Sequence, residues 1–65
     1  MWLNLTRGDN NNVLINLSNV AYIYPKKVRG DSTPAFTEIQ FVNGNFIEVK
    51  EPYKEIMELI REGNS

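Results

Sequence analysis

Two tyrosines followed by three cations give this sequence its one stretch of recognisable binding chemistry. The segment YIYPKKVRG contains Tyr22, Tyr24, Lys26, Lys27 and Arg29. Aromatic rings stack on unpaired bases and cations hold phosphates, so this pattern is typical of a surface for single-stranded nucleic acid. The alternative is that the tyrosines, which share strand parity with Val20, belong to the core or to a contact between subunits.

The tripeptide Arg-Gly-Asp, by which some extracellular proteins bind integrins, occurs twice, at residues 7–9 and 29–31. Both copies lie in predicted loops, where Gly and Asp are expected because they tolerate turn conformations. The N-terminal segment MWLNLTRGDN has no positive region followed by an apolar run of about 7 to 15 residues, which a secretory signal would need. We therefore interpret both triplets as loop chemistry, and we expect a cytoplasmic protein that does not bind integrins.

The residue inventory argues against catalysis and against a bound cofactor. The chain has no Cys and no His, so it lacks disulfides, thiolate metal ligands and the commonest general base. No Gly-rich phosphate loop or nucleophile elbow is present. The carboxylates near the C-terminus are Glu51, Glu55, Glu58 and Glu62. They are typical of a solvated helix face and of partners for the helix dipole, and we predict a non-enzymatic protein.

Charge is distributed unevenly along the 65 residues, although the formal net charge is only −1. Residues 1–30 contain four cations and one carboxylate, whereas residues 31–65 contain three cations and seven carboxylates. These are either solvated faces or unlike patches that meet between subunits. No apolar stretch approaches the roughly 18 residues of a membrane span, so we expect no membrane contact.

Period-two alternation of apolar residues predicts three strands in the first half of the chain, at about 2–7, 12–17 and 20–28. The segment RGDNNN between the first two strands suits a hairpin turn. Pro25 interrupts the third strand, and because proline cannot donate to a ladder, the strand bends, bulges or forms an edge there. The following loop from Lys26 to Ala35 is the longest connection, which is typical of a mobile or functional segment.

The segment AFTEIQFVNGNFIEVK predicts a hairpin of strands at about 36–42 and 46–50. A two-residue Asn43-Gly44 turn would pair polar with apolar side chains. A three-residue loop of residues 43–45 instead sets Ile39 against Val49 on one face and pairs Glu38 with Lys50 on the other. We predict this second register.

A helix over about 52–62 follows from the change of period after Lys50. Pro52 suits the first helical position, and Gly63 ends the pattern. The apolar positions that recur with helical spacing are Tyr53, Ile56, Met57 and Ile60. About 11 residues are too few for a helix that is stable alone, so this stripe must pack on the sheet.

The predicted fold is one domain over residues 1–65, mainly β, with five strands in a small bent meander or half-barrel of the SH3-like or Sm-like kind. One C-terminal helix caps the sheet. A chain this short buries only about 60% of its unfolded surface, and an open barrel leaves unpaired strand edges. We therefore expect homo-oligomers. The aromatic residues that we assign as candidate oligomer contacts are Phe36, Phe41, Phe46 and Tyr53.

The phrases MWLNLTR, INLSNVAYI and VNGNFIEVKEPYKEIMELI resemble the small FlbD-type proteins, named from flagellar operons, and similar short proteins of bacteria and their phages. This resemblance covers most of the chain outside residues 25–35 and implies a bacterial or phage origin in a family whose biochemical role is poorly defined. A regulatory or scaffolding action is our hypothesis for this chain. Sm proteins are similar in predicted architecture only, and none of their RNA-binding motif residues is present here. The leading hypothesis is a homo-oligomeric interaction module, and the alternative is an Sm-like ring that binds single-stranded RNA.

Overall fold

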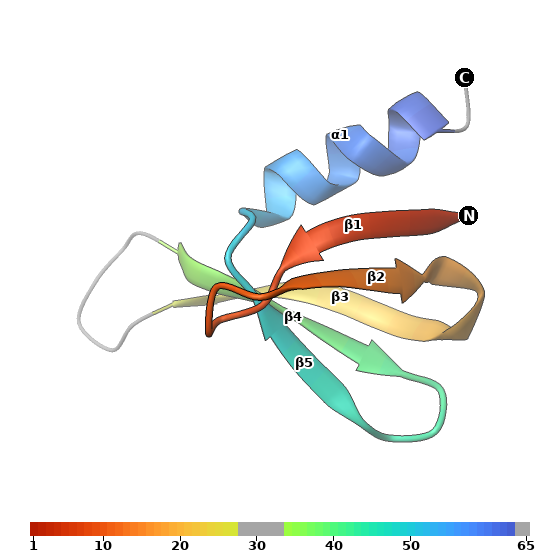
Figure 1. The fold of residues 1–65 in the computed structure, drawn as a ribbon, viewed down its shortest axis with the longest axis horizontal. Helices are drawn as coiled ribbons and strands as arrows, with labels where there is room; N and C mark the ends of the chain where they lie inside the picture. Colours follow the sequence, from red (N-terminus) through yellow and green to blue (C-terminus); the bar gives the residue numbers. More distant parts are fainter. Residues whose placement is uncertain (28–33, 64–65) are drawn as a thin grey trace.

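The computed structural model describes residues 1–27 and 34–63, which form five strands and one C-terminal helix (Figure 1). The elements in chain order are β1 (Trp2–Thr6), β2 (Asn12–Asn16), the 3-10 turn η1 (Leu17–Asn19), β3 (Val20–Lys27), β4 (Pro34–Phe41), β5 (Phe46–Val49) and α1 (Tyr53–Gly63). Each strand and the helix begin and end within two residues of the range predicted from the sequence, where the described residues allow the comparison.

The strands form two antiparallel sheets, a β1–β2 hairpin and a three-stranded sheet in the order β3–β4–β5. The end of β1 joins the two sheets, because Arg7 bridges to Val49, and Lys50 N–H donates to the Thr6 carbonyl at 2.8 Å. The Gly8 N–H adds another hydrogen bond between the two sheets, to the Glu48 carbonyl at 3.1 Å. Within the described ranges the strands pair in these two sheets and close no barrel.

The first hairpin follows the predicted alternation. Leu3 pairs with Ile15, both are buried, and buried Leu5 pairs with Val13. Asn10 takes a positive φ of 73° in the connecting turn, a conformation that Asn tolerates better than most residues. The RGDNNN segment is therefore a turn, as predicted.

The predicted register of the β4–β5 hairpin is wrong by two residues, although the predicted faces are right. Ile39 pairs with Ile47 rather than with Val49, and Glu38 lies opposite Glu48 rather than Lys50. The reason is Gly44, whose φ of +92° places it at the left-handed third position of a loop of residues 42–44.

The predicted faces of β3 also need correction. A register shift between Val20 and Tyr22 leaves Ala21 without a partner, so Val20 packs on the core while Tyr22 points to the opposite, exposed face. Because of this β-bulge, Tyr22 and Tyr24 do not share a face with Val20. The prediction that the two tyrosines belong to the core depended on that shared face. Pro25 lies on an edge strand, as expected, because β3 is hydrogen-bonded only to β4 among the described strands.

The core is small and lies where both sheets and the helix meet. Its buried apolar members among the described residues are Leu3, Leu5, Ile15, Ile39, Val49 and Ile56. Ile56 belongs to α1, and Leu59 and Ile60 pack beside it half-buried. The predicted stripe is therefore wrong at Tyr53 and Met57, which are exposed at 37% and 39%, because the helix is rotated so that Leu59 faces the core.

Candidate interaction surfaces

One face of the three-stranded sheet carries most of the residues to which binding chemistry was assigned. We call it the outer face, and its described members are Tyr22, Tyr24, Lys26, Phe36, Glu38, Gln40, Phe46 and Glu48. Cross-strand pairing aligns these side chains in rows across β3, β4 and β5. The opposite face of the same strands carries Ile39 and Val49 and belongs to the core.

Tyr22 and Tyr24 lie together on the outer face. Their rings stack with centroids 5.4 Å apart and planes inclined by 28°. The Tyr22 hydroxyl donates to Gln40, and the Tyr24 hydroxyl donates to Glu38 Oε2 at 2.5 Å. That hydrogen bond, together with partial desolvation and the nearby carboxylate charge, raises the pKa of Tyr24 to about 12.

Lys26 lies among carboxylates. Its Nζ is 3.3 Å from Glu38 Oε1 and 3.6 Å from Glu48 Oε2, and it sits over the Phe36 ring at 5.7 Å from the centroid. The Glu38 side chain is only 8% exposed, so its charge needs these partners. A cation held by two carboxylates presents little net positive charge to a phosphate. The Lys27 side chain and Arg29 lie outside the described residues.

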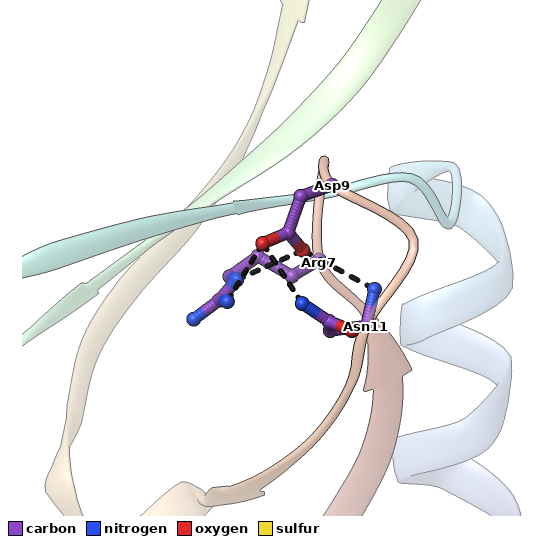
Figure 2. A network of polar contacts seen from close by, with 3 residues as sticks. All are labelled: Arg7, Asp9 and Asn11. Atoms are coloured by element: carbon purple, nitrogen blue, oxygen red, sulfur yellow. Dashed lines mark hydrogen bonds and ion pairs between the residues drawn. The ribbon is translucent and has the colours of Figure 1, made fainter.

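The first Arg-Gly-Asp triplet forms a closed polar network in the β1–β2 turn (Figure 2). Arg7 donates through Nε and Nη2 to the two Asp9 oxygens at 3.1 Å and 2.7 Å. Asn11 donates its backbone N–H and its side-chain amide to the same carboxylate. The Arg7 hydrogen bonds hold the pKa of Asp9 well below its usual range and raise the pKa of Arg7.

The ion pair between Arg7 and Asp9 bears on whether this Arg-Gly-Asp triplet could bind an integrin. The charges of Arg7 and Asp9 bind one another instead of pointing apart toward a receptor. The second triplet, residues 29–31, lies outside the described residues.

A groove with a mixed apolar and polar lining lies between the β1–β2 hairpin on one side and the end of β4 and the turn after it on the other. It encloses about 520 Å³ and its apolar lining is Trp2, Leu14, Ile15, Phe41 and Val42, completed by Asn16, Asn19 and Asn43. Trp2, Leu14 and Val42 are exposed at 62%, 66% and 68%. Trp2 and Leu14 share the face of the hairpin opposite the buried Leu3 and Ile15, and they are diagonal neighbours across β1 and β2.

The four candidate oligomer contacts do not form one patch with this groove. Phe41 is half-buried and lines it, whereas Phe36 and Phe46 belong to the outer face and Tyr53 begins α1. Trp2 and Leu14, which line the groove, are not among the residues that the sequence pattern singled out. The sequence could have indicated Leu14. Side chains alternate along a strand, so Leu14 points to the opposite face from Val13 and Ile15, where its neighbours are polar.

Among residues 1–27 and 34–63, no three potential ligands of His, Cys, Asp or Glu type gather as a metal would require. No helix in that part of the chain is long and apolar enough to cross a membrane. Comparison of the chain with models of protein families, with curated proteins and with solved structures gave no match.

Proposed function

We propose that this protein is a non-enzymatic module that assembles with copies of itself and acts in regulation or scaffolding. The observation that supports the proposal best is the exposure of Trp2, Leu14 and Val42 in a single groove. Single exposed apolar residues are ordinary, but a contiguous group that includes a tryptophan is typical of an interaction site. Trp is also among the residues that contribute most at protein interfaces.

The size of the core supports the same proposal. Among the described residues six apolar side chains are buried, and the 65-residue chain has no disulfide to support so small a core. Covering one large apolar side chain contributes about 1.5–3 kcal/mol. Association through the groove therefore adds apolar burial that the monomer lacks.

At the level of architecture, we propose that the two sheets form a bent half-barrel of the SH3-like or Sm-like kind. The bridge between Arg7 and Val49 supports this architecture, because it connects the end of β1 in the hairpin to β5 in the three-stranded sheet. We also propose a cytoplasmic location and a bacterial or phage origin, and the resemblance to FlbD-type proteins supports the origin.

The second candidate is an Sm-like ring that binds single-stranded RNA. The stacked and partly exposed pair Tyr22 and Tyr24 favours it, because aromatic side chains on a sheet face stack on bases. Lys26 argues against it, since Glu38 and Glu48 balance its charge. Self-association without nucleic acid is therefore the leading proposal.

Light scattering on the purified chain tests both candidates. We expect a mass that is a multiple of the 7.5 kDa chain and an absorbance spectrum without nucleic acid. Trp2→Ser is expected to lower the mass, whereas Phe46→Ser, an exposed aromatic on the outer face, serves as the matched control. A parent chain that stays a folded monomer at high protein concentration would contradict the proposal.

The RNA candidate has its own measurement. Lys26, Lys27 and Arg29 are each changed to Ser, and affinity for a single-stranded oligonucleotide is measured at several salt concentrations. Affinity that falls steeply with salt, and that the triple variant loses, would favour the second candidate, because phosphate contacts release counterions.

A further inference from the structure

Among the described strands, β2 and β3 each pair on one side only and take no part in the joint between the sheets, and of these two edges only the β3 edge is protected. The β3 edge carries a bulge at Ala21, a proline at position 25 and the cation Lys26. Bulges, prolines and lysines are the features by which proteins prevent an edge from pairing with another chain. The β2 edge, Asn12–Asn16, has no charge, no proline and no register shift.

The hydrogen bonds around the hairpin identify which β2 residues face outward. Arg7 N–H donates to the Asn11 carbonyl, and Leu17 N–H donates to the Met1 carbonyl. Hydrogen-bonded pairs alternate along an antiparallel ladder, so Val13 and Ile15 direct their backbone groups to β1. The backbone N–H and C=O groups of Asn12, Leu14 and Asn16 therefore point to the free edge.

We propose that two copies of this chain join along β2 as antiparallel strands, with Leu14 opposite Leu14 of the second copy. This mode rests on the proposed self-association and specifies its interface. The pairing extends the two hairpins into one four-stranded sheet, in which Asn12 lies opposite the second copy's Asn16. Each copy then uses the same surface, which is the isologous contact of a closed dimer.

A second copy suits this edge for two reasons. The segment NVLIN is uncharged, so pairing it with itself brings no like charges together. Trp2 and Leu14 lie on one face of the hairpin, so the symmetric sheet places both leucines between the two tryptophans in one apolar strip. Trp2 and Leu14 also line the groove, so the strip includes its β1–β2 wall.

The absence of cysteine permits a direct test of register. In Leu14→Cys the two introduced thiols would lie on facing residues, with Cα atoms about 5.5 Å apart, within the range of a disulfide. Asn4→Cys is the matched control, because Asn4 is the β1 partner of Leu14. In the proposed dimer the Asn4 positions of the two copies would lie three strand spacings apart, about 14 Å. We expect mild oxidation to convert Leu14→Cys to a covalent dimer and to leave Asn4→Cys monomeric in a denaturing gel.

Light scattering on edge variants separates this mode from self-association in general. Leu14→Lys is expected to yield monomers, whereas Ala21→Lys, on the protected β3 edge, keeps the parent mass; circular dichroism checks that both remain folded. A multimeric parent in which Leu14→Cys does not cross-link, or Ala21→Lys dissociates, would overturn pairing along β2 and leave the proposed function standing. A monomeric parent would overturn both.

Discussion

The carboxylate of Glu51 accepts the backbone N–H of Thr6 through both of its oxygens, at 2.8 Å and 3.0 Å. The carbonyl of the same residue accepts the Thr37 hydroxyl at 2.7 Å. Glu51 therefore ties the end of β1 and the middle of β4 to the segment that leads into α1 (Figure 1). It joins all three parts of the fold.

Replacing Glu51 by Ala is expected to lower the free energy of unfolding by about 1–3 kcal/mol, because it leaves the Thr6 N–H without its acceptor in a partly buried site. Urea denaturation followed by circular dichroism measures the change. Glu55→Ala is the control, since Glu55 is exposed in the first turn of α1 and its loss should matter by less than about 0.5 kcal/mol. Equal losses in the two variants would show that Glu51 does not join the sheets.

The alternation of apolar and polar side chains was enough to predict the first hairpin. A register shifted by one residue would have exposed Leu3, Leu5 and Ile15 together. It was not enough at Ala21 or in the β4–β5 turn. A bulge adds one residue without leaving a sign in the apolar pattern, and two registers that differ by two residues bury the same side chains. Backbone conformation decided between those registers, at Gly44.

The conformation of Gly44 gives a second prediction. At a φ of +92°, a side chain at this position would meet no other atom within 4 Å, so the cost of Gly44→Ala is backbone strain alone, about 1–2 kcal/mol of unfolding free energy. Gly8→Ala is the matched control, because its added methyl would meet only the Glu48 carbonyl oxygen at an ordinary 3.9 Å. Thermal unfolding of both variants is the measurement. A Gly44→Ala variant as stable as Gly8→Ala would contradict the loop of residues 42–44.

A third prediction concerns the network in the β1–β2 turn. The pKa of Asp9 is lowered chiefly by its hydrogen bonds to Arg7. A carboxyl group whose pKa is lower in the folded state stabilises the fold above its unfolded pKa of about 4, and this contribution is lost as the pH falls through the folded pKa. The stability difference between the parent and Asp9→Asn should therefore shrink below about pH 4.

Carboxyl NMR gives the measurement for Asp9. Its titration midpoint should lie below the usual range in the parent and return toward it in Arg7→Gln. Because both side chains are about half exposed, added salt should move the parent midpoint in the same direction. An Asp9 midpoint unaffected by Arg7→Gln would mean that the pair does not persist in solution.

The candidate site was harder to predict than the fold, because its character depends on cross-strand neighbours. Tyr22, Tyr24 and Lys26 were recognisable in the sequence, but the carboxylates beside Lys26 come from β4 and β5. Only the observed register brings Glu38 opposite Glu48, with one cation between them. The predicted register paired Glu38 with Lys50 instead.

The hydrogen bond from Tyr24 to Glu38 gives the fourth prediction. It raises the pKa of Tyr24 to about 12, so folding favours the protonated phenol. The resulting stabilisation is fully present below the unfolded pKa of about 10 and is lost as the pH rises through the folded value. In Glu38→Gln the carboxylate charge is absent, and the Tyr24 ring signals in NMR should titrate at lower pH than in the parent. Gln40→Glu is the control, because it adds a carboxylate beside Tyr22 while the partner of Tyr24 is kept. If Tyr24 titrated at the same pH in the parent and in Glu38→Gln, the hydrogen bond to Glu38 would not be the cause of the raised pKa.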